Sequence, residues 1–573
     1  MRNRILLLLV GVSTLIFSCG SGNSDTSRIA AIGGKQYGGQ FSFMSSEKIE
    51  SLFPLAIADI FSTRILSQIF EPLLKIDVTT TKVEPSIAES FTVSEDAKVF
   101  TFKIRKGVFF HDDECFGGKG RELTAHDVKY TLDLACSGID ENAISYLLVD
   151  KIKGAKEFNQ KNKSYNFPKQ GVSGIKVINN NTVQIQLAEP FMGFDKVLAH
   201  NSLGIFPKEA VEKYGKDVKM HAVGTGPFAL EKFDNEIIIL KRNPNYWGKD
   251  EFGNKLPFLD KVVLTYTKNK KSELLAFRKK EIDVVFEIPV EDIQDVFGSL
   301  EDAQNGKNVK HKVETETSLK MAYIAFDCQS KEFKDERVRK AFNIAIDRQG
   351  IIDNLLEGEG HPALNGFVPP MESYPSNRVI GNLFNPTAAK KLLEEAGYKD
   401  GSSFPSLNVY VNTKEGSTIH KMIKGVVADL KKNLNVTLKI KLCTIKERDD
   451  AISSGKAKLW RAGWIADYPD PVNFLSLFYG GNISDDFGGS AINDFKFKNK
   501  EFDDLYKKGL REINNDKRNE ILLKCDQLVI DHSAVMPILS DDFIVMVNIR
   551  VKDFKTNILQ GLDFSEIYIK EQR

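Results

Sequence analysis

Strand-like and helix-like segments alternate along the whole chain, and this alternation limits the fold more than any other feature of the sequence. The strand-like runs are enriched in β-branched and aromatic residues and span 99–105, 182–187, 236–240, 262–267 and 436–442. Because the two kinds of segment are interleaved, the pattern predicts an α/β protein. At 573 residues the chain is too long for one hydrophobic core, so about two to four domains are expected.

Helix signals are clear at three places in the sequence. Thr124 begins a capping-box pattern that is followed by apolar residues at helical spacing. Asp335 precedes an amphipathic stripe over 338–346. Asn385, followed by a proline, provides an N-cap, and Gly397 ends the apolar face that begins there. Each pattern predicts a helix that begins directly after its capping residue.

The N-terminus has the organisation of an export signal. Arg2 and Arg4 precede an apolar run at 5–16 that is too short to span a bilayer, so residues 1–18 are interpreted as a signal peptide. A small residue followed by Cys19 resembles a bacterial lipobox, and the resemblance implies cleavage before Cys19 and its lipidation. The polar residues of 19–32 would then form a flexible tether. An ordinary signal peptide with an incidental cysteine is the alternative.

Charge and motifs argue against several classes of function. The formal net charge is +1 and the basic residues are scattered, so nucleic acid is not an expected partner. The sequence contains no GxxxxGK[ST] motif, which indicates that the chain does not itself use ATP. A secreted hydrolase is disfavoured because GxSxG and HExxH are absent. No CxxC or paired-histidine spacing suggests zinc, and we expect neither a metal site nor a cofactor.

Five cysteines follow Cys19, and an odd number outside the cytoplasm leaves at least one free thiol. Cys115 and Cys136 are the only close pair, and they flank a loop and a predicted helix. A disulfide between them and two buried free thiols are both consistent with the sequence.

A series of short blocks resembles the family 5 extracellular solute-binding proteins, which include the oligopeptide- and dipeptide-binding proteins of bacteria. The most diagnostic block is FTFKIRKGVFFHD at 100–112. GWIADYPDP at 463–471 is another. The remaining blocks occur in the order of the family and lie at 69–74, 85–90, 123–128, 224–228, 242–247, 335–341, 345–348 and 389–398. The resemblance therefore covers nearly all of the chain after the signal peptide.

The resemblance implies a two-lobed periplasmic-binding-protein fold of type II with an extra third domain and a hinge between the lobes. Lobe I is expected to comprise residues 33–77, 201–317 and 539–573. The extra domain is expected at 78–200 and lobe II at 318–538. The family's role further implies a monomer that is exported to the cell envelope or periplasm and held at the membrane by its lipid only.

The implied function is solute capture for an ABC importer whose permease and ATPase are separate chains. The expected ligands are short peptides, bound in the cleft between the lobes. Another solute of the family, such as a nickel chelate, heme or an oligosaccharide, remains an alternative. The His111-Asp112 pair recurs in the family at a strand-end turn, so a structural role is expected for it instead of metal binding.

The segment 460–467 resembles the ligand-facing strand and loop of the oligopeptide-binding branch. By this resemblance Asp467 would meet the α-ammonium of a peptide, and Gly463 and Ile465 would pair with its backbone by strand addition. Trp464 would line a side-chain pocket, and Arg461 could bind a peptide carboxylate. The alternatives are a loop-capping role for Asp467, a core position for Trp464 and a solvent-facing or structural Arg461.

The opposite lobe is expected to provide a second backbone edge. The stretch 54–71 keeps the family's spacing between a proline and its Phe-Glu pair. Counting back from that pair places Ala58 and Ile60 on the backbone that would face the ligand.

Overall fold

The computed structural model describes residues 28–57, 59–77, 79–166, 168, 170–286, 288, 311–371, 374–483 and 492–570, and the side chains of 311–317 are not among those described. The signal peptide, Cys19 and Ala58 lie outside these residues, so the sequence-based expectations for them stay predictions. Within the described part of the chain, no helix has the length and apolar character needed to cross a membrane.

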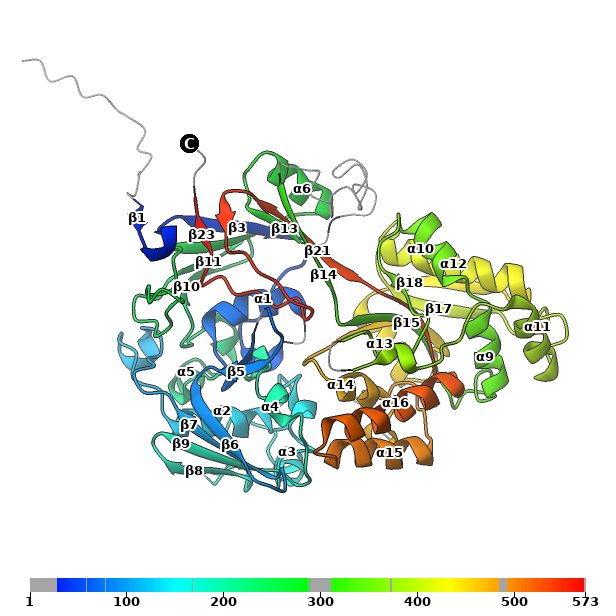
Figure 1. The fold of residues 1–573 in the computed structure, drawn as a ribbon, viewed down its shortest axis with the longest axis horizontal. Helices are drawn as coiled ribbons and strands as arrows, with labels where there is room; N and C mark the ends of the chain where they lie inside the picture. The colour runs from blue at the N-terminus through cyan, green and yellow to red at the C-terminus, as the bar shows by residue number, and fades with distance from the viewer. Residues whose placement is uncertain are drawn as a thin grey trace, which may run out of the picture.

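The first large sheet has seven strands and gathers distant parts of the chain (Figure 1). Its spatial order is β10 (Phe228–Phe233), β11 (Ile237–Arg242), β12 (Lys261–Tyr266), β3 (Gln40–Ser45), β13 (Val284–Phe286), β21 (Asp542–Asn548) and β14 (His311–Thr317). Phe41 and Phe43 from β3 pack against Phe564 and Phe286, with ring centroids 4.9 and 5.6 Å apart. The core of this lobe therefore joins the N-terminal, middle and C-terminal segments.

The second lobe is built on a six-stranded sheet. Its order is β16 (His361–Pro362), β20 (Val535–Ser540), β15 (Lys320–Phe326), β19 (Leu459–Ile465), β17 (Leu407–Asn412) and β18 (Leu438–Cys443). This lobe also contains α9 (Glu336–Ile344), α10 (Arg348–Leu355), α11 (Pro386–Glu395), α12 (Thr418–Leu434), α13 (Ile445–Ser453), α14 (Pro471–Leu475), α15 (Lys500–Arg511) and α16 (Asn515–Asp531). Figure 1 shows this lobe to the right of the first.

A four-stranded antiparallel sheet forms the extra domain, below the first lobe in Figure 1. Its order is β6 (Ala88–Val93), β7 (Val99–Ile104), β9 (Thr182–Gln186) and β8 (Ile175–Asn179), and α2 (Ala125–Ala135) packs on β8 and β9. The mixture of helices and sheets confirms the α/β prediction.

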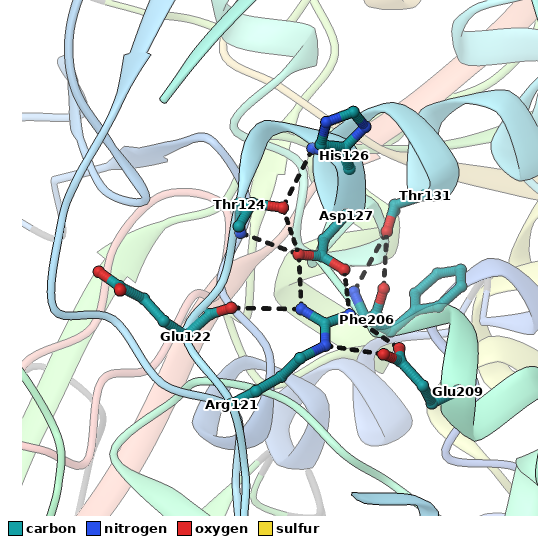
Figure 2. Close-up of polar contacts among 8 residues, drawn as sticks. All are labelled: Arg121, Glu122, Thr124, His126, Asp127, Thr131, Phe206 and Glu209. Carbon is teal, nitrogen blue, oxygen red and sulfur yellow. Dashed lines mark hydrogen bonds and ion pairs between the residues drawn. The ribbon is translucent and has the colours of Figure 1, made fainter. Parts of the chain in front are cut away.

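The capping residues begin their helices where the sequence predicts. Thr124 and Asp127 form a reciprocal capping box at the start of α2, Asp335 caps α9, and Asn385 caps α11. Figure 2 shows that Asp127 also accepts two hydrogen bonds from Arg121, of 2.6 and 2.9 Å. The same guanidinium reaches Glu209 on α5 (Lys208–Tyr214), so it ties the cap of one helix to a second helix.

Two chain crossings connect the lobes. The first runs from β14 to β15, and the second runs from β20 to β21. They lie side by side, because the Ser318 amide donates to the Asp541 carbonyl at 3.1 Å and Lys320 forms an ion pair with the Asp541 side chain. This pair of crossings has the position of a hinge.

The structure does not contain the disulfide considered for Cys115 and Cys136, since both are free thiols. Cys115 lies in the loop before α2, whereas Cys136 is buried at the C-terminal end of that helix. A helix of 11 residues is about 16 Å long, which is far beyond the reach of an S–S bond. Of the two alternatives that the sequence leaves open, the structure contains free thiols, with Cys136 buried and Cys115 partly buried.

Candidate functional site

A cavity of about 760 Å³ lies between the two lobes and the extra domain. One wall comes from the segment around α1 (Ile60–Ile69) and from the C-terminal stretch 553–566. Ala143, Ile144 and Tyr146 of the extra domain also line it, and lobe II contributes 463–467. A cavity of this size, enclosed by three parts of the chain that meet near a hinge, suits a small solute.

Strand β19 presents an unpaired backbone edge to this cavity. Just beyond the ends of β15, the Lys458 carbonyl accepts from the Asp327 amide at 3.0 Å and the Ala466 amide donates to the Leu319 carbonyl at 2.9 Å. The backbone groups of the even-numbered residues of β19 therefore face β15. Since strand residues alternate, the backbone groups of Arg461, Gly463 and Ile465 face the other way. The neighbour on that side, β17, pairs only as far as Trp460 among the described residues.

Asp467 follows this edge directly, and its carboxylate is held from several sides. The Asn473 side-chain nitrogen donates to Asp467 Oδ2 at 2.8 Å. The charge of this carboxylate adds to burial in raising the pKa of the nearby Tyr146 hydroxyl. His200 Nε2 lies 3.8 Å from Oδ1. The Ser202 amide donates to His200 Nδ1, so the neutral ring carries its proton on Nε2 and directs it at Asp467.

Burial changes the pKa of the groups around Asp467. Desolvation lowers the pKa of His200, although the charge of Asp467 opposes this effect. Desolvation likewise lowers the pKa of Lys151 to about 8, and the Lys151 ammonium donates to the Tyr146 carbonyl at 3.2 Å. With a neutral imidazole beside it, the Asp467 carboxylate keeps negative charge on the cavity side that the Lys151 ammonium offsets only in part, and this favours a cationic ligand group there.

The structure places Gly463, Trp464, Ile465 and Asp467 together on the cavity wall, as the sequence predicts. The Trp464 indole donates to Asn473 Oδ1 at 2.7 Å, so its ring is fixed and only partly buried. Arg461 is different, because its side chain is 9% exposed and does not line the cavity. A Cβ atom built on Gly463 would lie 3.3 Å from Arg461 Nη2, so the guanidinium packs against Gly463.

The opposite wall differs from an extended edge. Ile60 lines the cavity but is the first residue of helix α1, whose N-cap is Asp59. Since the helix uses the backbone carbonyl of its first residue, Ile60 can offer a ligand little more than its amide. Ile57 and Asp59, which flank the undescribed Ala58, also line the cavity.

Glu71 is a buried acid of the cavity wall that sequence analysis did not single out. It accepts hydrogen bonds from Thr225, Tyr246 and Trp247, at 2.7 to 3.1 Å. Burial outweighs these donors and raises the pKa of Glu71 to about 7. Trp247, the last residue of the family block at 242–247, therefore donates a hydrogen bond to a buried acid of the cavity wall.

The cavity wall is strongly acidic. Its described lining residues include eight carboxylates against two lysines, Lys75 and Lys555. The carboxylates are Asp59, Glu71, Asp77, Asp449, Asp467, Asp553, Asp563 and Glu566. His111, the residue considered for metal binding, is buried and donates from Nε2 to the Gly226 carbonyl at 2.9 Å. No group of three or more potential metal ligands occurs in the part of the chain that the structure describes.

Comparison with known families decides which class of protein this is. Residues 82–486, most of the chain, match the family model of the bacterial extracellular solute-binding proteins, family 5 (middle region). This chain belongs to that family.

Curated relatives of this family 5 protein span nearly its full length. It is 28% identical over 508 residues to the periplasmic oligopeptide-binding protein OppA of Escherichia coli, which covers 86% of each chain. It is also 28% identical over 555 residues to the oligopeptide-binding protein OppA of Bacillus subtilis, which covers 94% of each chain.

Solved structures show that the family 5 protein has the expected two-lobed fold with a third domain. The periplasmic binding protein DppA of Helicobacter pylori, in complex with the peptide STSA, aligns with a TM-score of 0.75 at 24% identity, over 93% of this chain and 99% of that one. An oligopeptide-binding protein of Borrelia burgdorferi aligns with a TM-score of 0.76 at 24% identity, over 92% and 99%.

Proposed function

We propose that this family 5 solute-binding protein captures short peptides in the cavity between its lobes and delivers them to the permease of an ABC importer. The observation that carries the proposal is the free edge of β19, which ends at the Asp467 carboxylate. An extended peptide can add to such an edge through its main chain, while an acid at the end of the edge binds its amino terminus.

Each part of the wall has a role in this arrangement. Gly463 and Ile465 offer backbone groups at alternate positions, and recognition of the main chain tolerates many side-chain sequences. Trp464 forms a rigid aromatic wall for one ligand side chain. Arg461 lies next to Gly463 but outside the cavity lining, so it would bind the carboxylate of a peptide only if ligand binding uncovered its guanidinium. On the opposite wall the segment through Ala58 and Ile60 would complete the enclosure.

The names of the relatives support a peptide ligand, since the proteins from Escherichia coli and Bacillus subtilis are oligopeptide-binding proteins. Delivery requires a permease and an ATPase on separate chains. The two adjacent crossings at Ser318 and Asp541 would let the lobes close over the ligand and open again at the permease. We further propose that the lobes are divided at these crossings, so that lobe II extends to Ser540 at the end of β20 and not only to 538, and that the protein is a monomer.

Native mass spectrometry of the purified protein tests this proposal. Recovery of mixed short peptides from the folded protein would support it. Recovery of a nickel chelate, heme or an oligosaccharide would mean that the ligand is that solute and not a peptide. Turnover of added peptides into fragments would contradict a binding function altogether.

The proposed location is the cell envelope, with the protein exported to the periplasm and tethered by a lipid on Cys19. The motivation is the apolar segment 5–16 followed by the lipobox-like residues. Cys19→Ala should move the protein from the membrane fraction to the soluble fraction. An unchanged membrane fraction would rule out this anchor.

A further inference from the structure

Lys196 connects the extra domain to lobe II at the side of the cavity where Asp467 lies. It belongs to the short helix α4 (Phe194–Val197), which packs on the four-stranded sheet through the contact of Phe194 with Phe100, ring centroids 5.2 Å apart. Its ammonium lies 2.9 Å from Asp470 Oδ2 and 3.2 Å from the Pro469 carbonyl, both in lobe II. The contact joins residues 274 positions apart in the sequence.

Asp470 is a fixed anchor for this contact. It is completely buried, and Arg518 of α16 binds both of its oxygens, at 2.7 and 3.0 Å. Its Oδ1 also accepts the Val472 amide at 3.0 Å. The two cations hold the pKa of the Asp470 carboxyl far below its ordinary value despite burial. The anion is thus present throughout the physiological pH range, and it is shared between two domains.

The loop that carries Asp470 also carries Asp467. Only Tyr468 and Pro469 separate the two aspartates, and Lys196 binds the Pro469 carbonyl directly. The backbone amide of Asp467 donates to Asn473 Oδ1 at 3.1 Å, so the loop is folded back on the start of α14. A residue that fixes one end of this loop restricts where the Asp467 carboxylate can stand.

The extra domain approaches Asp467 itself beside this contact. Tyr146 and His200 of the extra domain line the cavity with Asp467, and His200 Nε2 lies 3.8 Å from Asp467 Oδ1. An exposed ion pair between Glu189 and Arg511, 3.3 Å apart, joins the same two domains nearby. Asp467 therefore has neighbours from both the extra domain and lobe II. It keeps those from the extra domain only while the two domains are in contact.

We propose that Lys196 is a positioning residue for ligand recognition: by binding Asp470 and Pro469 from the extra domain, it holds the loop on which Asp467 meets the ligand's ammonium. The site for the ammonium is then complete only when the two domains are docked. The part of this inference that concerns a ligand rests on the proposed peptide function, whereas the part that concerns the loop does not.

The first experiment needs no ligand. Hydrogen exchange over residues 463–473 is compared in the wild type, Lys196→Met and Lys196→Arg. Methionine keeps most of the side-chain volume, and Asp470 keeps Arg518, so the variant should fold. We expect faster exchange in this segment for Lys196→Met and recovery of protection for Lys196→Arg. Unchanged exchange in Lys196→Met would overturn the proposal, whatever the ligand is.

Lys129→Met is the matched control. Lys129 also pairs with a buried aspartate, Asp133 at 2.9 Å, and its side chain is 17% exposed against 27% for Lys196. That pair lies within α2 and spans no domain boundary. Its loss should leave exchange over 463–473 at the wild-type rate, so an equal increase in both variants would show general loosening of the fold and overturn a specific role for Lys196.

The second experiment measures recognition by calorimetry with trialanine and N-acetyl-trialanine. Lys196→Met should weaken trialanine binding about tenfold and bring the ratio of the two affinities closer to one, and Lys196→Arg should restore both. An equal loss for both peptides would mean that Lys196 only stabilises the docked domains and would overturn positioning. If the wild type binds neither peptide, the proposed function fails, and the exchange experiment alone decides the role of Lys196.

Discussion

The Asn473 side chain is bonded to Asp467 and Trp464 at once: it donates to Asp467 Oδ2 at 2.8 Å and accepts from the Trp464 indole at 2.7 Å. One amide thereby sets the direction of both the carboxylate and the aromatic wall. Because an amide has a donor and an acceptor at fixed positions, no other side chain of this size can replace both bonds.

Asn473→Ala should therefore weaken peptide binding without changing the fold. Asp467 would lose a donor and Trp464 an acceptor, and we expect about a tenfold loss of affinity. Asn473→Asp keeps the acceptor for Trp464 but places a second negative charge beside Asp467. Calorimetry with trialanine measures both variants, and wild-type affinity in Asn473→Ala would contradict this role.

Local signals made much of the fold predictable. Thr124, Asp335 and Asn385 cap their helices through hydrogen bonds to residues two or three positions away, so the pattern is complete within a short stretch of sequence. The ligand-facing segment was likewise identified, by resemblance, from contiguous residues. The α/β class and the family follow from such local information.

Contacts between distant segments were not predictable in this way. The cavity-side role of Asn473 depends on a loop that folds back, and the Lys196–Asp470 contact joins two domains. For Cys115 and Cys136, nearness in sequence left a disulfide and free thiols both open, and the helix between them decides for free thiols. Ile60 was expected on a backbone edge that faces the ligand; it does line the cavity, but the Asp59 cap starts a helix there.

Backbone pairing along β19 predicts a periodic response to ligand methylation. Peptides methylated at one backbone nitrogen at a time should alternate between strong and weak loss of affinity. The alternation arises because successive amides of an added strand point to opposite sides. Competition against a fluorescent peptide measures the series. A uniform loss at every position, or none, would contradict strand addition to the edge of Gly463 and Ile465.

The acidic wall predicts a preference for cationic peptides. Seven acidic residues besides the partly protonated Glu71 line the cavity with two lysines, so Ala-Lys-Ala should bind more tightly than Ala-Glu-Ala, and added salt should reduce the difference. Norleucine in the central position is the neutral control and should fall between them. Tighter binding of the glutamate peptide would contradict the prediction.

His111 should make folding stability depend on acid. Burial lowers the pKa of His111 to about 4, below its ordinary value of 6.5, so the folded protein resists protonation there. As the pH falls, the unfolded chain binds a proton at this histidine near pH 6.5, before the folded protein does. The contribution of His111 to folding stability is therefore fully present above pH 6.5 and is lost as the pH falls towards 4. The free energy of unfolding should fall by about 3 kcal/mol over this pH range because of His111.

Urea unfolding of the wild type and His111→Gln across this range checks the prediction. The side-chain amide of glutamine can still donate to Gly226 but does not titrate. The stability difference between the two proteins should shrink as the pH falls from 6.5 to 4. A difference that is independent of pH would contradict a buried, neutral His111.

The coupling between Asp467 and the ligand's amino group tests the central claim most directly. Calorimetry on wild type and Asp467→Ala, each with trialanine and N-acetyl-trialanine, gives a double-mutant cycle. A buried ammonium without its anion should lose about 2–5 kcal/mol, so the wild type should strongly prefer the free peptide and the variant should bind both alike. Asp467→Asn should lose less than Asp467→Ala, because its amide oxygen still accepts a hydrogen bond. A coupling energy of zero would mean that Asp467 is a structural carboxylate and that the β19 edge does not end in an amine site.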